Sequence, residues 1–491
     1  MDKKYILSLD QSTQGTKALL FDQSGTLLMR RDKVHRQMIS QEGWVSHDPE
    51  EIYKNSIEVL RKVIEDSGID RSAVVSLGIS NQRETSLAWD RVSGKPVDSA
   101  IVWQCSRSAS ICEELKDRAQ EVRDVTGMAL SPYFPASKYA WILKNRKSAR
   151  EKMESGTLSL GTIDSYLVYR LSGKRIFKTD YSNASRTQLM NLRTGKFDDS
   201  LCGIFGISTD CLPEIEDSDG YYGETDLEGF LPSSVPIQTV LGDSHAALFG
   251  QVCLNKGMTK VTYGTGSSVM MNVGENPVFS RNGVVSSVGF KMNHKMTYVL
   301  EGNLNYTGAV ITWLKKDLKI IQDDCETESL SYEANPADRA YLVPAFSGLS
   351  APYWDSNARA AVIGMSRTTG RAEFVKAALS CIAYQITDVV KAMETDAGIC
   401  LNELRADGGP TKNCYLMQLQ SDLLGNRVLV PDQEELSGIG AAYGAGLAVG
   451  LYDERIFERI NRLAYEPLMG RSEREELYQG WKNAVRSVLD K

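Results

Sequence analysis

The sequence has none of the patterns that mark several large classes of protein. Its nine cysteines include no C-x-x-C pair, which argues against a zinc site or a disulfide framework and fits reduced thiols. No apolar run reaches the length of a membrane span, and the N-terminus enters a strand without an export segment. No dense Lys/Arg cluster offsets the net charge of −7, so we expect no nucleic-acid partner. These absences predict a cytoplasmic protein without a membrane partner.

Two familiar nucleotide-binding signatures are also missing. The chain has neither the G-x-x-x-x-G-K-[ST] pattern of a P-loop nor the G-x-G-x-x-G pattern of a dinucleotide-binding fold. What is present is an ordinary globular composition, with 42% hydrophobic and 24% charged residues. Because 491 residues exceed what one hydrophobic core usually supports, we expect at least two domains.

Two hairpins with similar tips occur, one in each half of the chain. Residues 5–22 read as strand, hydroxyl-rich turn and strand, and residues 260–272 repeat this order with a Gly/Thr/Ser turn. Such tips offer backbone N–H groups and hydroxyls to an anion, although either tip alone is more often an ordinary turn. Together they suggest a duplicated domain that binds a nucleotide between its copies, with Asp10 placed to hold Mg²⁺.

A carboxylate stands at a predicted strand-to-helix junction near the middle of the chain. Residues 240–250 read as the end of a strand followed by a helix, and Asp243 lies at the junction. Asp243 is the candidate general base, because a nearby carboxylate can accept the proton of a reacting hydroxyl. The alternative is that Asp243 only caps the helix.

Several segments resemble blocks of one enzyme family. The chain is similar to the FGGY carbohydrate kinases, and within that family most similar to the glycerol kinases. The matching segments are residues 81–85, 101–105, 133–142, 179–187, 343–355 and 407–409. The resemblance implies an α/β protein of two actin/ribonuclease-H-like domains, residues 1–248 and 249–491, with the active site in the cleft between them. It also implies a homodimer or homotetramer.

The resemblance assigns roles to individual residues of an ATP- and Mg²⁺-dependent kinase that acts on a small polyol or sugar. Asp243 matches the general base and Asp10 its partner, and both are predicted at the metal. The residues predicted to bind ATP are Thr13, Gln14, Gly15, Lys17, Thr265, Gly308, Thr312, Gly409 and Asn413. Those predicted to bind the acceptor are Arg83, Glu84, Trp103, Tyr133, Asp243, Ser244, His245 and Ser268.

Two departures from the glycerol kinase pattern concern the acceptor. Ser244 stands where those enzymes have a glutamine, and Ser268 where they have a phenylalanine. Because smaller side chains leave more room, we expect an acceptor larger than glycerol, such as a four- or five-carbon polyol or a xylulose-like ketose. A third departure, Thr312 where glutamine is frequent, leaves the preference for the base open.

Other interpretations remain open at this point. Arg83 and Glu84 could form a solvated ion pair, and Trp103 and Tyr133 could be core aromatics. His245 could line or cap the pocket without touching the acceptor. An ATP- and sugar-binding sensor of the same fold that phosphorylates nothing is the alternative from another class, since fold alone does not fix function.

Overall fold

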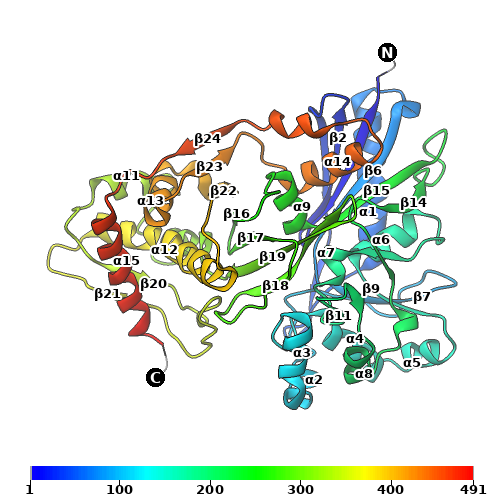
Figure 1. Cartoon of the computed structure of the whole chain (residues 1–491), viewed down its shortest axis with the longest axis horizontal. Coiled ribbons are helices and arrows are strands. Elements are labelled where there is room, and N and C mark those ends of the chain that lie inside the picture. Colours follow the sequence, from blue (N-terminus) through cyan, green and yellow to red (C-terminus); the bar gives the residue numbers. More distant parts are fainter. Residues whose placement is uncertain (1–2, 490–491) are drawn as a thin grey trace.

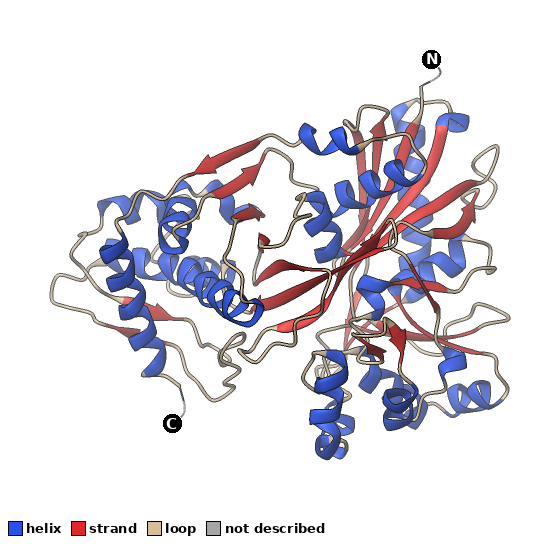
Figure 2. Ribbon diagram, in the orientation of Figure 1, coloured by secondary structure: helices blue, strands red, loops and turns tan. Residues whose placement is uncertain are grey.

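Two large mixed sheets carry the fold, which the computed structural model describes for residues 3–489. Each sheet is covered by helices, and the two halves meet along the middle of the molecule (Figures 1 and 2). The first sheet has the order β14 (Tyr221–Thr225), β15 (Val235–Gly242), β6 (Val74–Asn81), β1 (Tyr5–Gln11), β2 (Gly15–Asp22), β3 (Leu27–Val34). The second has the order β18 (Val285–Met292), β19 (Lys295–Leu304), β17 (Ser267–Gly274), β16 (Met258–Tyr263), β22 (Glu403–Asp407), β23 (Val428–Pro431), β24 (Arg462–Tyr465).

The two sheets share a core topology, to which the second sheet adds β18. In the first, β1, β2 and β3 form an antiparallel meander, and β6 and β15 then add parallel to β1. In the second, β16, β17 and β19 form the meander, and β22 and β23 add parallel to β16. This repetition confirms the predicted pair of actin/ribonuclease-H-like domains, and both predicted hairpins are present as β1–β2 and β16–β17.

Strand β1 is buried at every position, so both of its faces are covered. Leu7 and Leu9 pack in one cluster with α1 (Pro49–Ser67), whereas Ile6 packs in another with α14 (Leu436–Ala448). Successive side chains of a strand point to opposite faces, so a strand covered on both sides needs apolar residues at nearly every position.

Helix α14 belongs to the second half of the sequence but packs on the first sheet. Figure 1 shows it beside β2 and β6, and its contacts reach β1, β6 and β15. It also packs closely against α9 (Asp243–Gly250), because a Cβ on Gly440 would lie 2.0 Å from the carbonyl oxygen of Ala246. The small residues of α14 therefore serve close packing, and the helix joins the two halves.

Smaller elements complete each half. The first half adds the sheet β4 (Gln37–Ile39), β5 (Val45–His47), β8 (Ala100–Ile101), β7 (Ser86–Asp90), β9 (Leu158–Thr162), and the pairs β10 (Lys178–Asp180) with β13 (Glu214–Glu216) and β11 (Met190–Asn191) with β12 (Lys196–Phe197). Its other helices are α2 (Ala109–Glu114), α3 (Ala119–Thr126), α4 (Pro135–Asn145), α5 (Lys147–Glu154), α6 (Ile163–Leu171), α7 (Tyr181–Ala184) and α8 (Asp199–Phe205). The second half adds α10 (Gly308–Lys316), α11 (Glu326–Glu333), α12 (Arg371–Ala397), α13 (Cys414–Leu424), α15 (Arg471–Arg486) and the pair β20 (Tyr341–Val343) with β21 (Ala361–Ile363).

Helices α12 and α15 pack on strands of the second half. α12 contacts β17 and β19, and α15 contacts β20. From residue 3 to residue 489, no helix combines the length and the apolar character needed to cross a bilayer. The exact division at residue 248 stays a prediction.

Candidate active site

Two carboxylates lie at one edge of the first sheet. Asp10 is near the end of β1, and Asp243 begins α9 directly after β15. β1 and β15 flank β6 and both run parallel to it, so their carboxyl ends meet at the same edge. Burial raises the pKa of Asp10 to about 6; Lys17 opposes this rise, whereas the charge of Asp243 adds to it. Asp243 is therefore close enough to disfavour ionisation of Asp10.

This carboxylate pair fits a hydrated Mg²⁺ ion. Magnesium is usually held by one or two carboxylates, with waters and substrate phosphates filling the other positions. Residues 3–489 contain no cluster of three or more His, Cys, Asp or Glu side chains that could hold a metal by themselves. A cation beside Asp10 and Asp243 would also relieve the repulsion that contributes to the raised pKa of Asp10.

The hairpin β1–β2, predicted to bind phosphate, contacts two distant segments. Thr13 Oγ1 accepts a hydrogen bond of 3.0 Å from Trp103 Nε1. Lys17 Nζ lies 2.8 Å from a carboxylate oxygen of Glu435, the residue just before α14. A Cβ on Gly15 would lie 2.8 Å from the carbonyl oxygen of Lys33, so the turn needs glycine to approach β3. Gln14 is exposed at the same tip.

A cavity of about 460 Å³ lies beside the second hairpin, in the second half of the chain. It is lined by all five residues predicted there for the nucleotide: Thr265, Gly308, Thr312, Gly409 and Asn413. The apolar side chains of Leu379, Ile382 and Leu416 line it as well. A cavity with apolar walls and a few polar groups suits a nucleotide base and ribose.

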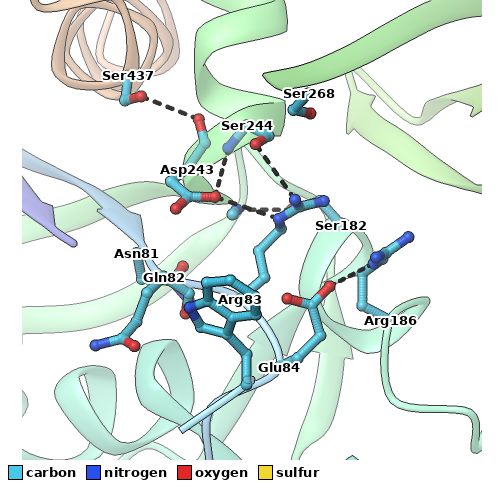
Figure 3. Close-up of polar contacts among 12 residues, drawn as sticks. Asn81, Gln82, Arg83, Glu84, Ser182, Arg186, Asp243, Ser244, Ser268 and Ser437 are labelled. Carbon is cyan, nitrogen blue, oxygen red and sulfur yellow. Dashed lines mark hydrogen bonds and ion pairs between the residues drawn. The ribbon is translucent and has the colours of Figure 1, made fainter. Parts of the chain in front are cut away.

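Arg83 and Glu84 lie in the turn after β6, with exposed fractions of only 6% and 2%. Arg83 Nε is 3.2 Å from Asp243 Oδ1, and Arg83 Nη2 donates to Ser244 Oγ at 3.3 Å (Figure 3). Glu84 Oε1 accepts from Arg186 Nε at 2.6 Å. The solvated Arg83–Glu84 pair considered from the sequence is therefore wrong, because each side chain is buried and bound to another partner.

Two aromatic rings stand beside this charged group. Trp103 and Tyr133 have ring centroids 5.5 Å apart, inclined by 58°, and both are only partly buried. Partial exposure distinguishes them from the core aromatics of the alternative interpretation. Trp103 also donates a hydrogen bond to Thr13, so its ring connects the residues predicted to bind the acceptor to the hairpin β1–β2.

Comparison with known proteins decides the family. Residues 5–250 match the N-terminal domain, and residues 259–449 the C-terminal domain, of the FGGY family of carbohydrate kinases. The chain belongs to the FGGY family of carbohydrate kinases. It is a phosphotransferase with an alcohol group as acceptor, and the non-catalytic sensor is not favoured.

Relatives within this family extend over the whole chain. Glycerol kinase 1 of Thermotoga maritima is 47% identical over 490 residues, and glycerol kinase of Carboxydothermus hydrogenoformans 44% over 491; the matches cover 98% or more of each chain. The structure of Plasmodium falciparum glycerol kinase with ADP matches with a TM-score of 0.94 at 34% identity, covering 99% of both chains. The xylulose kinase of Lactobacillus acidophilus shares the fold, with a TM-score of 0.89 at 21% identity and coverage of 99% and 98%.

The site of this kinase contains two charged residues that sequence reasoning did not assign. Glu301, on β19, has no exposed surface and receives both terminal nitrogens of Arg83, at 2.9 and 2.8 Å. Arg186 joins Glu84 to Glu301, with an ion-pair distance of 2.9 Å to the latter. The available signal was a lone acidic residue in the apolar segment Tyr-Val-Leu-Glu-Gly, which is unusual for a buried strand.

Lys138 was also missed, although it lies in a segment that resembles the family. It is fully buried on α4 and donates to the carbonyl oxygens of Trp103, Pro132 and Tyr133. Burial lowers the pKa of Lys138 to about 7. This amine therefore ties together the backbone that carries the two aromatic rings.

Ser244, Ser268 and His245, all predicted to bind the acceptor, are placed differently from one another. Ser244 and Ser268 are partly exposed, and the Ser268 hydroxyl donates to Glu301 at 3.3 Å. His245 is fully buried, and within the described chain neither ring nitrogen has a hydrogen-bond partner. Burial and the neighbouring Arg83 lower the pKa of His245 well below its usual range, which keeps the ring neutral. Its contact with the acceptor stays a prediction.

Proposed function

We propose that this kinase transfers the γ-phosphoryl group of ATP to a hydroxyl of a small polyol, with Asp243 as the general base. The position of Asp243 carries the proposal. Its side chain is 33% exposed, whereas that of Arg83 beside it is only 6% exposed. Asp243 is thus the part of this ion pair that is open to a substrate, and a carboxylate at hydrogen-bonding distance can accept the hydroxyl proton as the new bond forms.

The charged residues around Asp243 are suited to hold the acceptor. Arg83 and Glu84 supply donors and acceptors for adjacent hydroxyls, while Trp103 and Tyr133 offer apolar surface to the carbon chain. The nearly complete burial of Arg83 and Glu84 fixes their geometry before the acceptor arrives. Such pre-organisation allows binding energy to be used for orientation.

On the donor side, the two hairpins would hold the phosphates and the cavity of the second half would hold the nucleoside. Thr13, Gln14, Gly15 and Lys17 lie on the first hairpin, and Thr265 on the second. Phosphoryl transfer requires mainly positioning and charge stabilisation, which N–H groups, hydroxyls and a lysine provide. Mg²⁺, when held near Asp10 and Asp243, would neutralise charge on the β- and γ-phosphates.

The acceptor is proposed to be larger than glycerol, with a chain of four or five carbons. Ser244 accepts a hydrogen bond from Arg83 and Ser268 donates one to Glu301, and each presents a hydroxyl where a longer side chain would fill space. A pocket widened in this way binds a short acceptor with polar groups left unpaired, which weakens binding. The cytoplasmic location and the homodimer or homotetramer remain predictions from composition and family.

A coupled ADP-release assay tests the function directly. Mg-ATP is supplied with glycerol, erythritol, threitol, ribitol, xylitol, xylulose or ribulose, and each acceptor is ranked by kcat/KM. Preference for a four- or five-carbon acceptor supports the widened pocket, and preference for glycerol overturns the size assignment alone. No turnover of any acceptor would overturn the proposed function.

A further inference from the structure

A buried ionic cluster joins the two halves of this kinase behind the acceptor residues. Its centre is Glu301, on β19 of the second half, which has no exposed surface. Arg83 and Arg186, its partners, come from the first half and have exposed fractions of 6% and 1%. Arg83 binds both carboxylate oxygens of Glu301 in a fork, and Arg186 lies 2.9 Å from the same carboxylate.

Each arginine reaches onward to a residue of the proposed site. Arg83 Nε lies 3.2 Å from Asp243, the proposed base, and Arg186 Nε donates to Glu84 at 2.6 Å. We propose that Glu301 is a positioning residue for the acceptor: it fixes both arginines, and through them the carboxylates of Asp243 and Glu84. This inference rests on the proposed function of the site.

The electrostatics of the cluster supports this role. Although burial opposes ionisation of Glu301, Arg186 and Arg83 hold its pKa well below its usual range, so the carboxylate stays charged. Without the charge of Glu301, the buried guanidiniums of Arg83 and Arg186 would have only Asp243 and Glu84 as anionic partners. Arg83 would then be drawn toward Asp243, and the carboxylate that must accept a proton would be more tightly paired.

The cluster also makes the acceptor site depend on how the halves are placed. β19 belongs to the second sheet, and the Ser268 hydroxyl on neighbouring β17 adds a hydrogen bond of 3.3 Å to Glu301. Arg83 and Arg186 follow β6 and α7 in the first half. The acceptor residues therefore hold their present geometry only when the two halves are together, which makes Glu301 a contribution of the second half to acceptor binding.

The test is the substitution Glu301→Gln, which keeps the shape of the side chain and removes its charge. We expect KM for the acceptor to rise about tenfold or more, because small misplacements of orienting groups are costly, while KM for ATP changes less than about twofold. Glu301→Asp, which retains the charge, should recover part of the loss. Ser268→Ala, which removes one hydrogen bond to Glu301, should give a smaller rise of the same kind.

The chain offers a matched control in Glu403. This carboxylate is also buried and also binds two arginines, with distances of 2.5 Å to Arg405 and 2.9 Å to Arg427, but all three residues belong to the second half. Glu403→Gln should lower the melting temperature without raising KM for the acceptor. If both variants change the acceptor KM equally, or if Glu301→Gln leaves it unchanged in an active enzyme, the positioning role is wrong.

Two further outcomes separate the inference from the function on which it rests. If Glu301→Gln does not fold, the acceptor KM of Glu301→Asp and Ser268→Ala decides, and unchanged values in both contradict the inference. If the unsubstituted kinase turns over none of the polyols and sugars, the proposed function fails and the role of Glu301 fails with it.

Discussion

The proposed acceptor side and the proposed nucleotide side of this kinase are built in opposite ways. On the acceptor side, charged side chains from separate segments fix one another: Arg83 binds Asp243 and Glu301, and Arg186 binds Glu84 and Glu301. On the nucleotide side, a cavity of about 460 Å³ is lined largely by glycines, small polar residues and apolar walls at the ends of local elements. The acceptor side depends on paired charges, and the nucleotide side depends on free space next to the backbone.

This contrast predicts which substitutions each side tolerates. Removing a charge should damage the acceptor side, since it leaves a buried partner unpaired. Adding a single carbon should damage the nucleotide side, since space near the backbone is limited. Kinetic constants for the two substrates can be measured separately, so each expectation has its own readout.

The largest effect is expected from Asp243→Asn. The amide cannot accept the acceptor's proton, so kcat should fall by roughly 10² to 10⁴. Binding of ADP, measured by calorimetry, should be much less affected, because the nucleotide cavity does not include this residue. A fall of only a few-fold would contradict the general-base role and weaken the distinction between the sides.

Gly308→Ala should act on the nucleotide side. A Cβ at this position would lie 2.5 Å from the carbonyl oxygen of Gly264, so the loop must shift. We expect KM for ATP to rise about tenfold while KM for the acceptor stays unchanged. Gly409→Ala is the matched control: it lines the same cavity but its Cβ would meet nothing within 4 Å, so its effect should be smaller. If Gly308→Ala raised KM for ATP and KM for the acceptor equally, the contrast between the two sides would be wrong.

The same contrast explains how far the sequence could be interpreted. The two hairpins and the strand-to-helix junction at Asp243 depend on local patterns, and the structure has them. All five residues that the family resemblance assigned to the nucleotide in the second half line one cavity. Local patterns could not predict that α14 packs on the sheet of the first half.

The acceptor side was predicted only in part, because its partners lie far apart in the chain. Arg83 and Glu301 are separated by 218 positions, and Arg186 and Glu84 by 102. Nothing in the spacing of a single sequence indicates such pairs. A lone acid in an apolar strand marks Glu301 as unusual, but it does not name the arginines that make its burial possible.

A smaller effect is expected from the double substitution Ser244→Gln and Ser268→Phe. Larger side chains should narrow the acceptor pocket and raise the kcat/KM of glycerol relative to a five-carbon polyol by about fivefold or more. Ser268→Ala is the control, because it removes the hydrogen bond to Glu301 without adding a larger side chain. It therefore shows how much of the effect of the double substitution comes from the lost hydrogen bond. An unchanged ratio of kcat/KM values would mean that these two positions do not set acceptor size.

The smallest effect concerns pH and follows from the reliance of the acceptor side on charge. The folded kinase holds Lys138 with a pKa of about 7, whereas 10.5 is its ordinary value. Between these values the unfolded chain binds more protons than the folded one, so the free energy of unfolding should rise with pH by about 1 kcal/mol per unit from this group. Below pH 7 both states are protonated and the contribution is constant.

Urea unfolding at pH 7, 8 and 9 should therefore show a rise in the unsubstituted kinase that is absent in Lys138→Met. Lys144→Met is the control, because this lysine lies on the same helix α4 but is 54% exposed, and it should leave the rise intact. A rise that persists in Lys138→Met would contradict its assignment to Lys138. If the rise is lost in Lys138→Met, the backbone of Trp103 and Tyr133 is held by an amine that is half-charged near neutral pH. The acceptor side, unlike the nucleotide side, would then respond to pH even in the residues that support the two aromatic rings.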